Sequence, residues 1–140
     1  MGTGERLEIR RWVQKAIALL ESAGTEETLA QIADVSGPFT EGKRYMFALD
    51  LDGRLLAHPY NGQLVGRNLA DLTDFDGKAF IKKLLTTVKK RGYGYADYTW
   101  PLPDSKIVQK KTVFFEQVGG IVLCGGFYAP EEDPLAKQTL

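Results

Sequence analysis

The fold of this 140-residue chain is decided by residues 93–128, which read YGYADYTWPLPDSKIVQKKTVFFEQVGGIVLCGGFY. Apolar and aromatic residues alternate with polar ones through much of this stretch, and turn-forming residues interrupt it twice. The pattern predicts strands over 93–100, 107–118 and 121–128, joined by a turn at 101–105 and a tight hairpin at Gly119-Gly120. We therefore expect an antiparallel meander in the last third of the chain.

Helical patterns precede this meander. Apolar side chains recur at helical spacing over residues 5–23, and Thr25 is placed as the N-cap of a second helix that ends at Gly37-Pro38. A third helix is predicted over residues 76–91, with an apolar stripe and with Gly92 as its C-cap.

A short hairpin and a long connection lie between the helical segments. The apolar run at 45–49 is followed by Asp52-Gly53, a strong hairpin signal, and by a second run at 55–58. Residues 59–75 are rich in Asn, Gly and Asp and read as a long connection, a kind that is often functional. Helices, hairpin and meander together predict an α+β domain with a mostly antiparallel central sheet.

Length and composition set limits on function. At 140 residues a single domain is expected, over residues 1–128, with a polar tail over 129–140. Eighteen Lys and Arg balance eighteen Asp and Glu, which argues against a nucleic-acid partner. One Cys and one His cannot build a zinc site, and one Cys cannot form a disulfide within the chain. We expect no metal, no cofactor and no transmembrane segment in this chain.

Two residues could carry chemistry, but both have simpler interpretations. His58 follows a predicted strand and precedes Pro59, where it could serve as a general base or haem ligand but is more often structural. Cys124 lies inside an apolar strand and is expected to pack in the core. The Asp-x-Asp-Gly sequences at 50–53 and 74–77 lack the first and last ligands of a calcium-binding loop.

The β-rich stretch could also form a pocket. Alternation places Tyr98 and Trp100 on one face of their strand, and Lys111, Val113 and Phe115 on one face of the next. If these faces meet, an ammonium group lies within aromatic walls, which suits a small carboxylate. The alternative is that the lysines at 106, 110 and 111 form a solvated hairpin edge that opposes aggregation.

Seven short motifs, in order along the chain, resemble the signature of single Cache sensor domains. They are GKRYMFALDLDG (42–53), LAHP (56–59), VGRNL (65–69), DFDG (74–77), GYADYTWP (94–101), KTVFF (111–115) and CGGFY (124–128). The resemblance implies a PAS-like fold, with a long N-terminal helix and additional helices packed on a central antiparallel sheet. It also implies a ligand-sensing function in bacterial signal transduction or chemotaxis, without enzymatic activity.

The resemblance further implies a pocket for a short organic acid such as pyruvate, acetate, lactate or propionate. The matching positions for its polar and aromatic lining are Tyr45, His58, Tyr98, Trp100 and Lys111, while Phe47 and Phe115 would supply apolar wall. Lys111 is the expected counter-charge. Asp74, Asp76, Gly77 and Gly94 match positions that shape the fold.

Other questions of function stay open at this level. An alternative function is a protein–protein interaction module that dimerises through Trp12 and the apolar stripe of the N-terminal helix, with a vestigial pocket. The resemblance implies an extracytoplasmic, periplasmic location. If Met1 is the native start, the absence of a signal-peptide pattern behind it predicts a cytoplasmic location instead.

Overall fold

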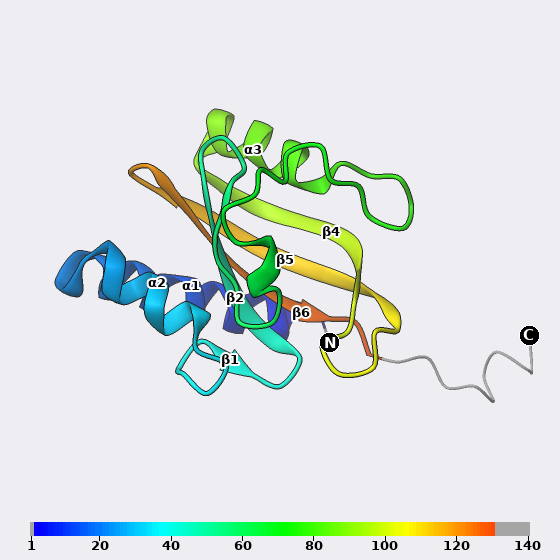
Figure 1. The fold of residues 1–140 in the computed structure, drawn as a ribbon, viewed down its shortest axis with the longest axis horizontal. Helices are drawn as coiled ribbons and strands as arrows, with labels where there is room; N and C mark the ends of the chain where they lie inside the picture. The colour runs from blue at the N-terminus through cyan, green and yellow to red at the C-terminus, as the bar shows by residue number, and fades with distance from the viewer. Residues whose placement is uncertain (1, 131–140) are drawn as a thin grey trace, which may run out of the picture.

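A computed structural model describes residues 2–130, which form a central antiparallel sheet with helices on both of its faces (Figure 1). The sheet has six strands: β1 (Thr40–Glu41), β2 (Arg44–Asp50), β3 (Leu55–Ala57), β4 (Tyr93–Pro101), β5 (Val108–Val118) and β6 (Ile121–Tyr128). Their order is β1-β2-β6-β5-β4, with β3 paired to β2. The predicted α+β class and the predicted meander, β4-β5-β6, are confirmed.

The register of the meander brings three pocket candidates together. Tyr98 on β4 lies opposite Lys111 on β5, and Lys111 lies opposite Tyr128 on β6. Directly paired residues of neighbouring strands point to the same face of a sheet. The two faces that alternation predicted for Tyr98 and Lys111 therefore coincide.

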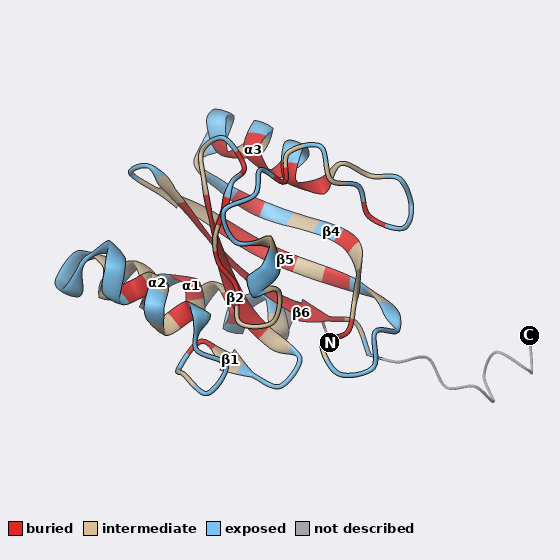
Figure 2. Ribbon diagram, in the orientation of Figure 1, coloured by how far each residue is buried: buried red, intermediate tan, exposed pale blue. Residues whose placement is uncertain are grey.

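Residues 2–130 also form three α-helices: α1 (Gly2–Ala23), α2 (Thr25–Ala33) and α3 (Phe80–Arg91). Helices α1 and α2 cover one face of the sheet, and α3 covers the other together with the long connection between β3 and α3 (Figure 1). Figure 2 shows that buried residues run along β2, β5 and β6, the strands between these two layers.

Strand alternation sorts the apolar residues into two cores. On β2, Met46 and Ala48 face α1, while Tyr45, Phe47 and Leu49 face α3 and the long connection. The expected stripe of α1 packs on the first side: Ile9, Val13 and Ala16 have no exposed surface.

The predicted N-cap of the second helix is wrong by one residue. Gly24, with φ 89°, holds the N-cap position, and no side chain caps the helix. The Gly24 amide donates to the carbonyl of Leu20, and the Gly24 carbonyl accepts hydrogen bonds from the amide and the hydroxyl of Thr28. This glycine therefore ends α1 and begins α2, because its backbone reaches a conformation that side chains disfavour.

The predicted start of the third helix, at residue 76, is also wrong, because α3 begins at Phe80. The carboxylate of Asp74 accepts hydrogen bonds from the amides of Asp76 and Lys78 through Oδ1, and from the amide of Thr99 on β4 through Oδ2. These bonds hold residues 74–78 as a loop on the edge of β4, where the loop satisfies a strand amide that would otherwise be unpaired.

The predicted end of the second helix, at Gly37-Pro38, is wrong too, because α2 ends at Ala33. Gly92 ends α3 in the left-handed conformation, as expected, and a short 3₁₀ helix, η1 (Gly62–Leu64), lies within the long connection. Most of the predicted tail, residues 131–140, lies outside the described residues. Within residues 2–130, no helix combines the length and the apolar character that crossing a membrane requires.

Candidate functional site

Lys111 is the most unusual residue of the described structure, because its ammonium group lies inside the protein. It projects from the middle of β5 into the core on the α3 side, and only 1% of the residue is exposed. A Cβ atom built on Gly126 of β6 would lie 2.7 Å from Lys111 Cε. A glycine at position 126 therefore gives the lysine side chain its room. The interpretation of Lys111 as part of a solvated edge is wrong, although Lys106 and Lys110 are exposed.

Four aromatic rings surround the ammonium group. Lys111 Nζ lies 4.0 Å from the ring centroid of Tyr45, 5.2 Å from Phe47, 5.4 Å from Tyr128 and 5.7 Å from Tyr98. The negative face of an aromatic ring attracts a cation at these distances, more strongly where water is excluded. The rings partly compensate for the lost hydration of the cation.

A hydrogen-bonded chain runs from the ammonium group to the backbone. Lys111 Nζ donates to Tyr45 Oη at 2.8 Å, and the hydroxyls of Tyr45 and Tyr128 are 3.2 Å apart. Tyr128 donates its own proton to the carbonyl of Pro101 at 2.8 Å, so the Tyr45 hydroxyl is the donor in the bond between the two tyrosines. Each oxygen in the chain therefore accepts from the group before it, and the chain orients Tyr45 to accept from Lys111.

The charge of Lys111 has no anionic partner among residues 2–130. None of the ion pairs of the described residues involves Lys111. An ammonium group has three N–H donors, and Tyr45 takes one of them. Burial lowers the pKa of Lys111 to about 7. The lysine is thus poised between a neutral amine and a cation that a buried anion would stabilise.

His58 lies beside this cation and is held in one tautomer. Its Nδ1 accepts hydrogen bonds from the backbone amides of Tyr60 and Asn61, both at 3.0 Å. Burial and the nearby charge of Lys111 lower the pKa of His58 to about 3, so the ring is neutral at physiological pH. A neutral imidazole with an accepting Nδ1 carries its proton on Nε2. His58 therefore offers an N–H donor on its other side.

A small cavity lies between these polar groups and an apolar wall. Its volume is about 20 Å³, enough for about one water molecule. The polar or aromatic lining residues are Phe47, His58, Asn61, Phe80, Tyr98, Trp100 and Lys111, and the aliphatic ones are Leu55, Leu64, Leu69, Leu72 and Ile81. The ring of Phe80 stacks on Tyr98 at 3.9 Å between centroids and fixes one side of the cavity.

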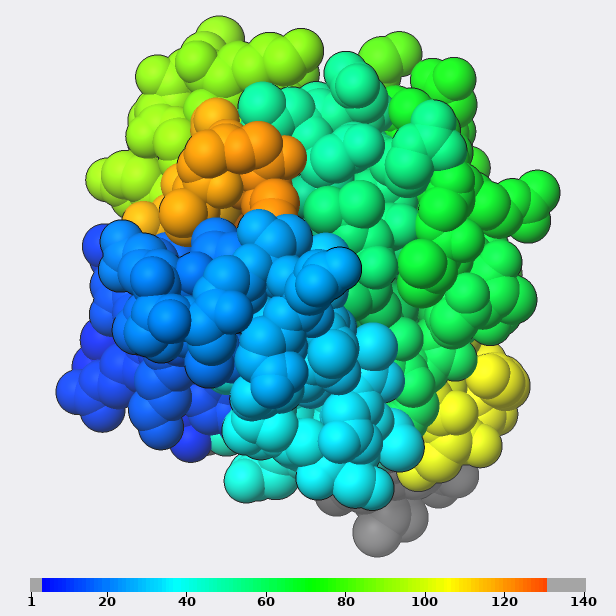
Figure 3. Space-filling view, turned by 60° about the vertical axis from the view of Figure 1, so that its left-hand side comes forward, coloured from blue at the N-terminus to red at the C-terminus, as the bar shows by residue number. Residues whose placement is uncertain are grey.

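A second hollow, of about 90 Å³, adjoins this cavity on the side of the exposed Lys106, and we call it the outer hollow. Its lining includes Tyr45, Tyr60 and Lys106, and it shares Asn61 and Trp100 with the inner cavity. In the space-filling view, the long connection (green) and the turn before β5 (yellow) meet at the surface (Figure 3). Asn61 and Trp100 therefore lie at the boundary between the two spaces, and Tyr45 lies between the ammonium group and the outer hollow.

The structure brings five of the seven predicted pocket residues to the inner cavity: Phe47, His58, Tyr98, Trp100 and Lys111. Tyr45 lies behind the ammonium group and lines the outer hollow. Phe115 does not line the cavity. It shares a face of β5 with Lys111, but a separation of four residues corresponds to about 13 Å along a strand, and its ring lies against Gly94, below α3.

Sequence reasoning missed Asn61 and the apolar wall from the long connection and α3. Asn61 follows His58-Pro59 by two residues, inside a connection whose length alone suggested function. Asn61 lies close to His58 because the backbone amides of Tyr60 and Asn61 both donate to His58 Nδ1 and so form a turn. Such a turn has no periodic pattern in the sequence. Cys124 is fully buried, as expected, and its burial raises the pKa of its thiol.

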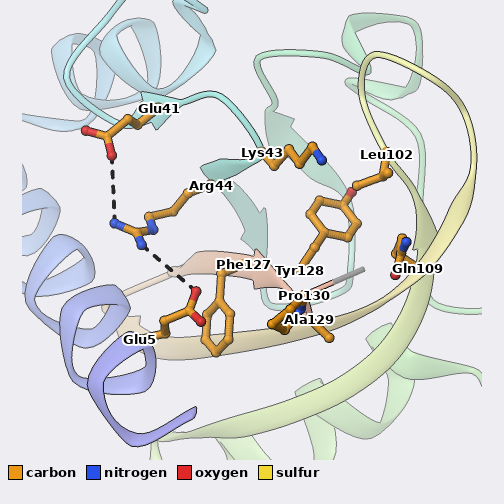
Figure 4. Close-up of a pocket in the computed structure, with 10 residues that line it drawn as sticks. All are labelled: Glu5, Glu41, Lys43, Arg44, Leu102, Gln109, Phe127, Tyr128, Ala129 and Pro130. Atoms are coloured by element: carbon orange, nitrogen blue, oxygen red, sulfur yellow. Dashed lines mark ion pairs between the residues drawn. The ribbon is translucent and has the colours of Figure 1, made fainter. Parts of the chain in front are cut away.

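A larger hollow, of about 330 Å³, shares Leu102 with the outer hollow and is lined in part by Tyr128 (Figure 4). It is lined by the beginning of α1, by Lys43 and Arg44, and by the end of β6. The Arg44 guanidinium forms ion pairs with Glu8 at 2.8 Å, Glu41 at 3.9 Å and Glu5 at 4.0 Å. Because acidic side chains surround Arg44, this hollow suits an anion less well than the Lys111 cavity does.

Comparison with known proteins identifies a family for most of the chain. Residues 20–129 match the family model described as single Cache domain 2. The sensor histidine kinase MctS of Rhizobium johnstonii is 33% identical to this chain over 99 residues, which cover 69% of this chain. The matched part makes up 21% of that kinase, so the chain spans about a fifth of its length.

Solved structures share the fold. The periplasmic sensor domain of a chemotaxis protein superposes with a TM-score of 0.82 at 28% identity, over 93% of this chain and 99% of that one. A Cache chemosensory domain described for its carboxylic acid recognition superposes with a TM-score of 0.77 at 24% identity, over 91% and 95% of the two chains. The arrangement of sheet and helices is therefore that of periplasmic and chemosensory Cache domains.

Proposed function

Because this chain belongs to the single Cache domain family, a family of sensor domains in chemoreceptors and histidine kinases, we propose that it binds a short-chain organic acid of the pyruvate, acetate, lactate and propionate class. Binding takes place in the cavity at Lys111. The domain senses the acid on behalf of a signalling protein, and the chemotactic or kinase output belongs to that larger protein.

The observation that carries this proposal is the buried ammonium group of Lys111, which has aromatic walls and no carboxylate partner among the described residues. Leaving a charge unpaired inside a protein costs several kcal/mol. A carboxylate ligand supplies the missing anion and accepts the charge-assisted hydrogen bonds that Tyr45 does not take. The carboxylic acid recognised by the related chemosensory domain agrees with this chemistry.

Binding involves no catalytic step in this proposal. A general base needs a free lone pair near neutral pH, and the Nδ1 lone pair of His58 already accepts two backbone amides. The ring therefore acts as a fixed donor in the pocket wall. The location that fits the proposal is periplasmic, as in the related sensor domain of a chemotaxis protein.

Entry of the acid requires movement in the wall. The inner cavity, at about 20 Å³, is smaller than an acetate ion, and the outer hollow has about 90 Å³. Asn61 and Trp100 line both spaces, so displacement of these two side chains joins them. We expect the ligand to enter from the Tyr60 side and to close the wall behind it.

A thermal-shift screen of two- to four-carbon acids tests the proposal. A ligand at about 100 times its dissociation constant stabilises the folded state by about 2.7 kcal/mol, which raises the melting temperature by several degrees. Lys111→Met should lose this response, since it keeps the length of the side chain without the charge. Lys110→Met is the matched control, because Lys110 is exposed on the same strand. The site assignment fails if both variants respond equally or no acid stabilises the wild type.

A homodimer through α1 is a second proposal for this chain. Ile9, Val13 and Ala16 are used within the domain, which leaves Leu7, 49% exposed, and the half-buried Trp12 to contact a partner. Light scattering of Leu7→Glu and Trp12→Glu should then give half the mass of the wild type. An unchanged mass in both variants would count against the dimer.

A further inference from the structure

The outer edge of strand β4 is open along its first half. Among residues 2–130, β4 is the last strand in the order of the sheet and pairs with β5 alone, so its other edge faces away from the sheet (Figure 1). An open strand edge presents backbone donors and acceptors to which another extended chain can bond. The inference that follows concerns this edge and does not depend on acid binding at Lys111.

Hydrogen bonds at the two ends of β4 show which of its backbone groups point outward. The amide of Gln117 on β5 donates to the carbonyl of Gly92, whereas the amide of Thr99 donates away from β5, to the carboxylate of Asp74. Bonding to the neighbouring strand alternates from one residue to the next along an antiparallel pair. Residues 94, 96 and 98 therefore bond to β5, and residues 93, 95, 97 and 99 turn their amides and carbonyls to the open edge.

The loop before α3 covers only the second half of this edge. Asp74 accepts from the amide of Thr99, and Lys78 Nζ donates to the carbonyl of Asp97 at 2.6 Å. Three backbone groups of the first half have no hydrogen-bond partner among residues 2–130: the amides of Tyr95 and Asp97 and the carbonyl of Tyr95. Both residues are exposed, so an incoming strand can reach these groups.

A hollow of about 200 Å³ lies beside the open groups, between β4 and α3. Its apolar lining comes from Phe80 and Leu84 of α3, Ala96 of β4 and Phe115 of β5. The volume is that of about seven water molecules in the liquid, which leaves room for one aliphatic side chain. A strand paired with β4 turns every second side chain toward the α3 side of the sheet, and so into this hollow.

Five cationic side chains surround the open edge: Lys78, Lys83, Arg6, Arg10 and Arg91. The two lysines line the hollow, and the three guanidinium groups lie on the α1 side, at 5.0, 5.6 and 5.8 Å from the ring centroids of Tyr95 or Tyr93. None of the five forms an ion pair within the described residues. The carboxylates of Asp97 and Glu116 oppose them, which leaves an excess of positive charge along the edge.

This charge decides between two occupants of the edge. In a symmetric pair of β4 strands the same residues meet across the interface, so the cations of one copy would face those of the other. A segment that carries acidic side chains complements the arginines instead.

We propose that the open edge of β4 binds an extended acidic segment of another protein, which adds to the sheet as a further strand. The backbone of the segment bonds to Tyr95 and to the amide of Asp97. One of its apolar side chains fills the hollow below α3, and the neighbouring acidic side chains turn to the opposite face, toward Arg6 and Arg10. The bound segment therefore alternates acidic and apolar residues.

Fluorescence polarisation of labelled peptides tests the charge and the strand pairing. The peptide SEVEIES should bind with a dissociation constant below about 1 mM, and SKVKIKS, in which lysine replaces glutamate, should bind at least about tenfold more weakly. Successive backbone amides of a strand point to opposite edges. Of two SEVEIES peptides, methylated on the backbone nitrogens of the glutamates or of the valine and isoleucine, one should lose binding and the other keep it.

Amide hydrogen exchange locates the peptide on the protein. SEVEIES should slow exchange at Tyr95 and Asp97 by at least about tenfold, whereas Thr99, whose amide is already bonded to Asp74, is the internal control. Lys83→Glu should weaken binding by about tenfold. Lys89→Glu makes the same change of charge at an exposed position of α3 that does not line the hollow, and it should bind as the wild type does.

Several results would overturn the proposal. Equal binding of both peptides would remove the charge argument, and unchanged exchange at Tyr95 and Asp97 would remove the strand pairing. Absence of binding up to about 1 mM SEVEIES would mean that the lysines protect the edge from pairing. A dimer in light scattering whose formation slows the same two amides would make a second copy the occupant. None of these results bears on acid binding at Lys111.

Discussion

The two faces of the sheet are both buried, but they are built differently. The face under α1 is filled with aliphatic and aromatic side chains such as Met46, Phe114 and Leu123. The face under α3 and the long connection carries the same kinds of residue and, among them, Lys111 and His58. A buried cation and a buried imidazole contribute less to stability than apolar residues of the same size. The first face therefore serves mainly to hold the fold, and the second gives up stability for a polar pocket.

The glycines of β6 illustrate the same division within two residues. A Cβ atom on Gly125 would meet Val13 and Ile9 of α1, at 3.1 and 3.3 Å. A Cβ atom on Gly126 would instead meet the side chain of Lys111. Because successive residues of a strand point to opposite faces, one glycine lets the helix approach and the next makes room for the lysine.

The largest effect is expected from removing a side chain on the α1 face. Phe114 has no exposed surface and packs against Tyr95 at 5.0 Å between ring centroids. Phe114→Ala should destabilise the domain by about 3–5 kcal/mol, through lost burial and the cavity left behind. Urea unfolding followed by circular dichroism measures this loss. A loss below about 1 kcal/mol would mean that the α1 face does not hold the fold.

The opposite face should respond to pH through Lys111. Its pKa is about 7 in the folded state and about 10.4 in the unfolded chain. Between these values the unfolded state binds a proton that the folded state does not, so stability rises with pH by up to about 1.4 kcal/mol per unit. Below pH 7 both states are protonated and this dependence disappears.

Urea unfolding at pH 7.0 and 9.0 compares the two states of Lys111. Lys111→Met should be more stable than the wild type at pH 7.0, and its stability should change less between the two values. Lys110→Met serves as the control that keeps the pH dependence. Equal slopes for the wild type and Lys111→Met would show that the lysine keeps an ordinary pKa.

Acid binding should show the reverse dependence on pH. A carboxylate needs the ammonium form of Lys111, and the amine form prevails in the unbound protein above about pH 7. The affinity for pyruvate or acetate should therefore fall as pH rises from 7 to 9, by at most tenfold per unit. Titrations in buffers of different ionisation enthalpy should detect proton uptake on binding at pH 8. Constant affinity across this range would exclude Lys111 as the titrating counter-charge.

Some residues of the pocket on the α3 side of the sheet could be predicted from the sequence and others could not, for physical reasons. Alternation placed Tyr98 and Trp100 on one face of β4, and Lys111 on one face of β5, because the period of a strand is fixed by its backbone. It left open whether the two faces meet, which the register of the strands decides. It gave no reason to exclude Phe115 from the same face of β5, since how far the cavity extends along the strand depends on the residues that surround it. The strand order, which brings β6 between β2 and β5, is set by contacts far apart in the chain.

The long connection was the least predictable part of the pocket. The turn at His58 and the loop at Asp74 are both held by side chains that accept backbone amides, and such contacts leave no periodic trace in the sequence. The helix expected from residue 76 was displaced for this reason. Asn61 was missed because its position beside the His58 ring depends on this turn, which the structure shows and the sequence pattern does not.

The smallest effects on stability are expected from substitutions of Gly125 and Gly126. These two neighbouring glycines face opposite sides of the sheet, so they compare its two faces at a single pair of positions. Neither Gly125 nor Gly126 has a positive φ, so alanine is compatible with the backbone at both. Gly125→Ala should push against Val13 and Ile9, and Gly126→Ala against Lys111. Overpacking of this kind costs about 1–3 kcal/mol. Stability should fall in both variants, since both sites are buried.

Acid binding should separate the two variants. Gly126→Ala displaces Cε of Lys111, so it should weaken binding of a carboxylate, whereas Gly125→Ala should bind the acid as the wild type does. Titration at a temperature where both variants are fully folded compares them directly. If Gly125→Ala weakens binding as much as Gly126→Ala does, the two faces are coupled through β6, and the division of the sheet into a structural and a ligand-binding face is wrong.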